Sequence, residues 1–152
     1  MVTEEKIKEK KQISFGKLID QARYKKTTSI PDKVKEKIAQ TPYYLFIYIP
    51  SDEILKISVF PIKSARIKKI LIRLKEFSPE LVKGISEIMK KFNLGNSTIH
   101  TTGLCFEKIN CYYETYVSID DLPISLEKLR KEFLKVPRVE GVKIIDIQVT
   151  PT

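Results

Sequence analysis

The stretch IKKILIRLKEFSPELVKGISEIMKKF, residues 67–92, carries the clearest structural signal in this chain of 152 residues. Its first part alternates along the chain, with Ile70, Ile72 and Leu74 on one face, as in a strand. Ser78 and Pro79 then open a helix, because serine caps helix N-termini and proline fits the first helical position. Apolar residues follow at helical spacing, at Leu81, Ile85, Ile88, Met89 and Phe92. The stretch therefore predicts a strand followed directly by an amphipathic helix.

The chain after this stretch predicts two strands, a helix and a last strand. The two strands are expected at residues 98–106 and 111–119, joined by a turn of hairpin length. Ser125 caps a second helix, which Pro137 ends, and the last strand reads VKIIDIQV, residues 142–149. The order strand, helix, strand, strand, helix, strand is that of the ferredoxin-like fold, in which two helices cover one face of a four-stranded antiparallel sheet.

The other face of such a sheet needs a cover, which a second subunit, another domain or a ligand supplies. On residues 111–119, Tyr112 should share a face with Glu114 and Tyr116, and Tyr113 with the alternate set. We expect one of these tyrosine sets to face the open side and to support oligomerisation. A stacking platform for nucleic acid is the alternative.

Residues 24–62 predict a small β-rich unit with one short helix, preceded by a charged N-terminal extension at residues 1–23. A strand is expected at residues 27–30, and Pro31 opens the helix. Two strands follow around the turn PSDE, residues 50–53. The first of them, YYLFIYI at residues 43–49, is apolar on both faces and should be buried on both. A unit of about 39 residues is too small to cover both faces of this strand. We therefore expect a partner chain or the second half of the chain to cover one of them.

The composition is that of a folded, basic protein. Hydrophobic residues make up 42% of the chain, and 28 Lys and Arg against 19 Asp and Glu give a net charge of +9. Lysine outnumbers arginine 23 to 5, and there are 22 isoleucines, a bias typical of thermophile proteins or of an AT-rich genome. No apolar run approaches the ~20 residues of a membrane-spanning helix, and residues 1–12 do not resemble a signal peptide. We therefore expect a cytoplasmic protein without a membrane partner.

Residues 67–149 resemble the ACT domain, a small-molecule-sensing module of regulators of amino-acid metabolism. The resemblance is carried by the element order, the turn KEFSPEL at 75–81, the hairpin at 99–119 and the ending VPRVEGVKIIDI at 136–147. It implies that an amino acid binds at the turn across a subunit boundary, where the candidate ligand-binding residues are Phe77, Ser78, Pro79, Glu80, Leu81 and Val82. Glu80 stands where the family has glycine, and its side chain adds bulk and repels a carboxylate. The backbone amides near Leu81 and Val82 remain usable for an anion.

Residues 24–62 are similar to the AbrB/SpoVT-type swapped-hairpin DNA-binding domain. The matching parts are YKKTTSIPDKVKEKI at 24–38, YYLFIYIP at 43–50 and DEILKISVF at 52–60. The departure lies at residues 41–44, TPYY, where that family has a Pro-Gly-Asp turn. The resemblance implies that two chains interlock their hairpins, which would also cover the doubly apolar strand.

Two basic clusters bear on DNA binding. Residues 17–37 carry a net charge of +4, and residues 63–75 hold six basic residues and no acid. Positive charge gathered on one surface binds phosphates, whereas a solvated lysine-rich surface is the alternative explanation for both clusters. The candidate DNA-binding residues are Arg23, Lys25, Lys26, Lys33, Lys35 and Lys37.

The chain offers no recognisable catalytic or metal-binding set. His100, Cys105 and Cys111 lack the spacing of a zinc site and a fourth ligand. We expect the two cysteines to be free thiols, with a hairpin disulfide as the alternative. There is no nucleophile and base pair and no glycine-rich phosphate loop, so we expect no enzyme, no cofactor and no metal.

Together these features predict an α+β regulatory protein of two or more chains. Its N-terminal unit would bind DNA, and its ferredoxin-like, ACT-like half would dimerise and sense a small metabolite such as an amino acid. The alternative is an ACT-like regulatory or assembly protein without DNA binding that acts on a protein partner.

Overall fold

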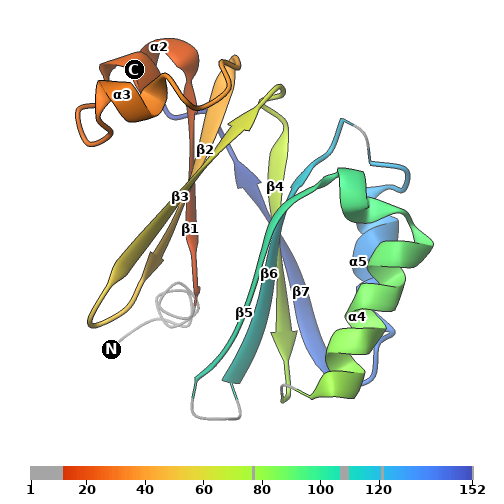
Figure 1. Cartoon of the computed structure of the whole chain (residues 1–152). Helices are drawn as coiled ribbons and strands as arrows, with labels where there is room; N and C mark the ends of the chain where they lie inside the picture. The colour runs from red at the N-terminus through yellow and green to blue at the C-terminus, as the bar shows by residue number, and fades with distance from the viewer. Residues whose placement is uncertain (1–11, 77, 107–109, 121, 152) are drawn as a thin grey trace.

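The computed structural model describes residues 12–76, 78–106, 110–120 and 122–151, and it contains two antiparallel sheets (Figure 1). The first sheet has the order β1-β2-β3, with β1 at Phe15–Asp20, β2 at Tyr43–Pro50 and β3 at Leu55–Ile62. The second has the order β5-β6-β4-β7, with β4 at Ile67–Leu74, β5 at Thr98–Phe106, β6 at Asn110–Ser118 and β7 at Val139–Ile147. Within the described residues, no helix is both long and apolar enough to cross a membrane.

Two helices cover one face of the four-stranded sheet. Helix α4, Pro79–Lys91, follows β4 and leads through the short 3-10 helix η1, Leu94–Asn96, to β5; helix α5, Leu126–Leu134, joins β6 to β7 (Figure 1). The hydroxyls of Ser78 and Ser125 accept hydrogen bonds from the backbone amides of Leu81 and Lys128, so both predicted serine caps are confirmed. The α+β class is also confirmed, and the strands and helices expected after residue 67 are present.

The three-stranded sheet packs on the opposite face of the four-stranded sheet (Figure 1). Leu18, Leu45 and Ile47 from its inner face form one buried cluster with residues of the larger sheet, namely Ile67, Tyr116 and Ile147. Tyr112, Glu114 and Tyr116 are all buried, and the last two belong to this junction, as the predicted alternation of β6 requires. The cover that the sequence requires is therefore supplied by the N-terminal part of the same chain.

The N-terminal unit begins earlier than the sequence indicated. Strand β1 pairs with β2 along its whole length, so the expected boundary at residue 23 is wrong and falls inside helix α2, Gln21–Lys26. The strand expected at residues 27–30 is absent. The chain instead forms helix α2, where Asp20 accepts a hydrogen bond of 2.8 Å from the amide of Arg23, and the residues after Lys26 pair with neither neighbouring strand of the sheet. The unit has two short helices rather than one. The second, α3 at Asp32–Lys35, is a single turn whose apolar Val34 stays exposed.

Within residues 12–151 as described, helix α2 and the segment after it cover the outer face of the three-stranded sheet at one end. Tyr24 of α2 stacks on Tyr44 of β2 with ring centroids 3.7 Å apart, and Ile30 and Ile38 pack on the same cluster. Strand β2 is thus buried on both faces by residues of its own chain. The swapped hairpin is not needed to account for its doubly apolar sequence.

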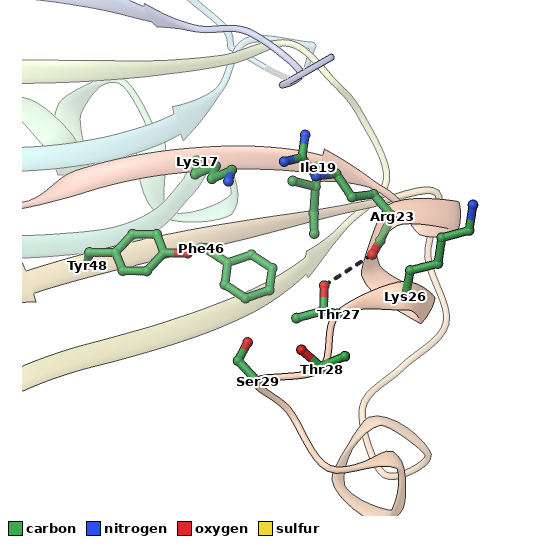
Figure 2. Close-up of a pocket in the computed structure, with 9 residues that line it drawn as sticks. All are labelled: Lys17, Ile19, Arg23, Lys26, Thr27, Thr28, Ser29, Phe46 and Tyr48. Atoms are coloured by element: carbon green, nitrogen blue, oxygen red, sulfur yellow. Dashed lines mark hydrogen bonds between the residues drawn. The ribbon is translucent and has the colours of Figure 1, made fainter. Parts of the chain in front are cut away.

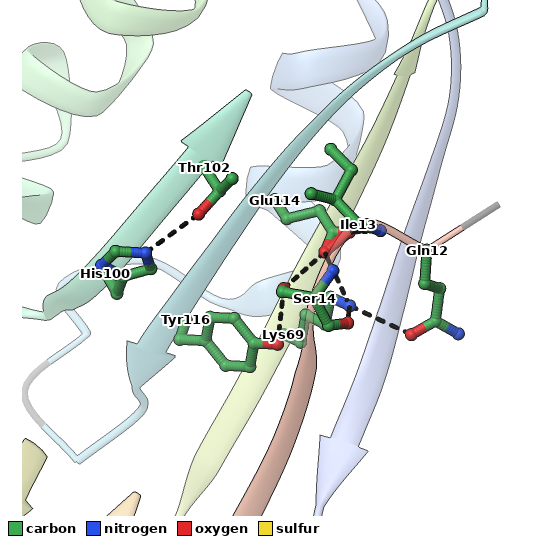
Figure 3. A network of polar contacts seen from close by, with 8 residues as sticks. All are labelled: Gln12, Ile13, Ser14, Lys69, His100, Thr102, Glu114 and Tyr116. Carbon is green, nitrogen blue, oxygen red and sulfur yellow. Dashed lines mark hydrogen bonds and ion pairs between the residues drawn. The ribbon is translucent and has the colours of Figure 1, made fainter. Parts of the chain in front are cut away.

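A buried ion pair lies at the junction of the two sheets (Figure 3). Lys69 Nζ of β4 and Glu114 Oε1 of β6 are 2.8 Å apart, and both side chains are at most 1% exposed. The ammonium also donates to the carbonyl oxygen of Ser14 at 2.7 Å and to Gln12 Oε1 at 3.0 Å, so each of its three N–H groups has an acceptor. Lys69 is therefore fully paired despite its burial.

The carboxylate of Glu114 is equally well paired. Its oxygens accept hydrogen bonds from the amides of Ile13 and Ser14 at 3.0 and 2.9 Å, and from the Ser14 hydroxyl at 2.6 Å. The same hydroxyl lies 2.8 Å from the Tyr116 hydroxyl. The segment that leads into β1 is thus fixed to the four-stranded sheet by backbone and side-chain bonds to one charged pair.

Removing one member of this pair should be costly. In Lys69→Met the Glu114 carboxylate remains buried without a counter-charge, and the free energy of unfolding should fall by about 3–5 kcal/mol in urea denaturation. The double variant Lys69→Met/Glu114→Gln should recover part of that loss, because the glutamine side chain carries no charge and its single oxygen still accepts from one of the two amides that now bond to different carboxylate oxygens.

The neighbouring Lys68 provides a matched control on the same strand. It pairs with Asp146, whose side chain is 52% exposed, so Lys68→Met should lower the unfolding free energy by less than about 1 kcal/mol. Equal losses for Lys68→Met and Lys69→Met would show that burial of the Lys69 pair does not stabilise the junction.

The burial of Tyr116 predicts that the stability of the protein falls at alkaline pH. Burial raises the pKa of its phenol above the ordinary 10.0, so the unfolded chain releases the proton at a lower pH than the folded protein does. The free energy of unfolding should therefore fall above about pH 10, by up to ~1.4 kcal/mol per pH unit for this one group. Tyr116→Phe should lose about 1 kcal/mol near neutral pH with its hydrogen bond, yet show a shallower decline above pH ~10. Parallel denaturant titrations across this range measure both effects, and equal slopes in the two proteins would contradict the assignment.

Candidate anion-binding site

A pocket of about 420 Å³ lies on the outer face of the three-stranded sheet, beside α2 (Figure 2). Its lining comes from β1, from α2 with the segment that follows it, and from β2. The lining residues are Lys17, Ile19, Arg23, Lys26, Thr27, Thr28, Ser29, Phe46 and Tyr48. We call this hollow the basic pocket, because three of its residues are cationic and none is acidic.

Local structure brings the three cations together. Alternation along β1 places Lys17 and Ile19 on the outer face, while Leu18 between them faces the other sheet. The Asp20 cap then turns the chain into α2, where Arg23 and Lys26 are three residues apart and so lie on the same side of the helix. Figure 2 shows the Lys17 and Arg23 side chains extending toward one another past Ile19.

Arg23 is held in place by the C-terminal segment. Its Nη1 donates a hydrogen bond of 2.6 Å to the carbonyl oxygen of Pro151, which uses one of the five N–H donors of the guanidinium group. The Thr27 hydroxyl donates to the Arg23 carbonyl at 3.1 Å, which fixes the end of α2 (Figure 2). The guanidinium is thereby oriented, and a planar group of this kind suits a phosphate or a carboxylate.

Two aromatic rings form the opposite wall of the pocket. Phe46 and Tyr48 lie two residues apart on β2, with ring centroids 6.3 Å apart and an interplanar angle of 20°. Phe46 is buried, whereas Tyr48 is half-buried. Cations, hydroxyls and rings in one hollow suit a ligand that combines negative charge with a flat apolar group.

The structure divides the predicted DNA-binding residues. Arg23 and Lys26 line the basic pocket, whereas Lys25 lines a different cavity, and Lys33 and Lys37 are exposed around α3. Lys35 donates to the backbone carbonyls of Lys25 and Thr27, and its Nζ lies 5.9 Å from the centre of the Tyr24 ring. Its ammonium group is therefore engaged in contacts within the N-terminal unit. Lys17 was not among the predicted site residues, although the period of two in β1 places it beside them.

The predicted ligand-binding turn is occupied by helix capping. The amide of Leu81 donates to the Ser78 hydroxyl at 3.2 Å, and the amide of Val82 donates to the Ser78 carbonyl at 3.1 Å. The expectation that these two amides are available to a ligand is therefore wrong. Leu81 is in the core, Pro79 and Glu80 are exposed in the first turn of α4, and Phe77 lies outside the described residues.

Cys105 and Cys111 form a disulfide, so the expectation of free thiols is wrong. The reason is register: the two residues lie directly opposite each other in the pairing of β5 with β6, with Cα atoms 4.0 Å apart. His100 shares a hydrogen bond of 2.9 Å with the Thr102 hydroxyl and packs against Phe60, and burial lowers its pKa. Among the described residues, no three His, Cys, Asp or Glu side chains lie close enough together to hold a metal ion.

Comparison with known proteins adds no family to this description. The chain matches no family model, and a search of curated proteins found no significant match.

Proposed function

We propose that this protein is a regulatory nucleic-acid-binding protein that holds the phosphates of its target in the basic pocket. The observation that carries the proposal is the meeting of Lys17, Arg23 and Lys26 at one hollow whose lining contains no acid. Phosphates bind to such a surface because neutralising them releases condensed counterions. Of the basic residues in the cluster at 17–37, we therefore propose these three as the phosphate-binding ones.

The charged groups of the basic pocket are suited to binding phosphates and not to recognising individual bases. Two of its three cations are lysines, which act as point charges, and its one arginine is partly engaged by Pro151. Binding should therefore depend strongly on salt and weakly on base sequence. The protein would attach to nucleic acid without a sharply defined sequence motif.

The C-terminal half is proposed to be a ferredoxin-like, ACT-like module. The proposal is supported by the place of β4 between β6 and β7, and by the two helices that connect strands across a single face. Its role would be regulatory and not catalytic. The cytoplasmic location and the assembly of two or more chains stay predictions from the sequence.

A second cavity offers a place for the proposed effector. It measures about 230 Å³ on the face of the four-stranded sheet toward β1, and its lining includes Gln12, Leu71, Arg73 and Lys143. Its two cations suit a carboxylate, although Arg73 Nε already lies 3.4 Å from Glu140. Gln12 also accepts a hydrogen bond from Lys69, so a ligand here would touch the network that joins the two sheets.

The phosphate-binding role predicts a specific loss of salt dependence. Lys17→Gln/Lys26→Gln should weaken binding of a fluorescent oligonucleotide at low salt. It should also reduce the slope of log K against log salt by about 1.4–1.8, the change expected for two lost phosphate contacts. Fluorescence anisotropy across a salt series gives both quantities. These lysines are chosen because Arg23 is also bonded to Pro151.

The control is Lys33→Gln/Lys37→Gln, which removes the same charge from exposed positions outside the basic pocket. It should leave the slope nearly unchanged. Equal losses in the two double variants would mean that the attraction is diffuse, and no binding at low salt by the unaltered protein would refute the nucleic-acid function.

The effector role predicts stabilisation by a small carboxylate. Free amino acids screened by thermal shift should include one that raises the melting temperature, because a ligand of the native state alone stabilises it. Arg73→Gln should abolish that rise, whereas Lys83→Gln, which alters an exposed pair on α4, should preserve it. A rise that survives Arg73→Gln would exclude this cavity.

A further inference from the structure

The outer face of the three-stranded sheet continues beyond the basic pocket as an aromatic surface. Alternation places Phe15 of β1 and Phe46 and Tyr48 of β2 on this face, and we call these three residues the ring platform. Helix α2 covers the face only near Tyr44. At the other end Phe15 is 44% exposed and Ile57 of β3 is 51% exposed.

The strand register places the rings and the cations in adjoining rows. Phe15 lies opposite Tyr48, and Tyr48 lies opposite Ile57, so one row across the sheet consists of two rings and an isoleucine. The next row toward α2 begins with Lys17, which lies opposite Phe46. The ring platform is thus flanked on its α2 side by the cations of the basic pocket, as Figure 2 shows for Phe46, Tyr48 and Arg23.

Charge is distributed unevenly around this surface. The strand residues that point outward include no acid, and the cations Lys17, Arg23 and Lys26 lie toward α2. The turn between β2 and β3, at the opposite end, carries Asp52 and Glu53. A bound polyanion would therefore have its phosphates near α2 and its uncharged groups over the rings.

Resting on the proposed function, we infer that the target is single-stranded nucleic acid whose bases stack on Phe15 and Tyr48 while its phosphates enter the basic pocket. Base stacking on aromatic side chains requires exposed base faces, which a duplex hides between neighbouring pairs and a single strand presents. Stacking is also tolerant of sequence, which agrees with a pocket that reads charge and not base edges. A protein partner fits less well, because three cations border the apolar surface.

The test crosses two ring variants with two ligands in fluorescence anisotropy. The ligands are a labelled single strand of thymidines of about 12 nucleotides, within the site sizes of single-strand-binding folds, and an abasic strand with the same phosphates. Phe15→Leu and Tyr48→Leu remove a ring but keep apolar bulk. Each should weaken binding of the thymidine strand about tenfold, yet leave binding of the abasic strand unchanged, because only the former has bases to stack.

Two further variants separate stacking from other effects. Tyr48→Phe retains the ring and should retain full affinity. Leu55→Ala removes an exposed apolar side chain without a ring and should also retain it. Denaturant titration shows whether Tyr48→Leu perturbs the fold. Phe15 is 44% exposed, so Phe15→Leu should leave the fold intact and tests the inference in either case.

The outcomes distinguish this inference from the function on which it rests. If thymidine and abasic strands bind equally and Phe15→Leu changes neither, stacking is refuted while phosphate binding stands. If no strand binds at low salt, the nucleic-acid function itself is refuted. If Leu55→Ala weakens binding as much as Phe15→Leu does, the surface is a general apolar interface and the inference is overturned.

Discussion

The buried pair of Lys69 and Glu114 is the constraint on which the arrangement of the two sheets depends. Two charges removed from water are tolerated only when their remaining donors and acceptors are paired, and here the partners are supplied by residues 12–14 at the entry to β1. The four-stranded sheet therefore cannot keep this pair buried and satisfied without the N-terminal segment beside it. Gly16 reinforces the same contact, since a Cβ atom at this position would come 2.7 Å from the Tyr116 ring. Charge pairing and close approach both fix β1 on β6.

Fixing the inner face determines which surface remains for function. Leu18, Leu45 and Ile47 are buried in the junction, so the side chains available for binding are the alternate ones, which point outward. That set combines rings on β1 and β2 with Lys17, and α2 adds Arg23 and Lys26 at one end. The open face that the sequence assigned to the four-stranded sheet is closed within one chain. The exposed aromatic surface lies instead on the three-stranded sheet.

The C-terminal half was predictable because each of its signals is local. Helical spacing and the Ser78 and Ser125 caps define α4 and α5, and alternation defines the faces of β6. The N-terminal unit was less predictable, since Thr27, Thr28 and Ser29 have strand composition but follow a helix that Asp20 caps. The disulfide depends on the register of β5 with β6, and the burial of Lys69 depends on a partner more than fifty residues away, at Gln12. Arg23 and Lys26 of the candidate site were predicted from charge, but the internal use of Lys35 was not, because its partners are backbone carbonyls.

The position of β1 suggests how an effector could act on the binding surface. The segment at residues 12–14 holds the charged network, and the strand that follows it carries Phe15 and Lys17. A ligand that touches Gln12 from the second cavity would therefore act on the same continuous strand that forms one edge of the ring platform. Such a ligand changes nucleic-acid affinity only if it binds one arrangement of this strand better than another, and nucleic acid must then change the affinity for the ligand by the same factor. The bond from Lys69 to Gln12 places this point of contact within the charged network that joins the two sheets.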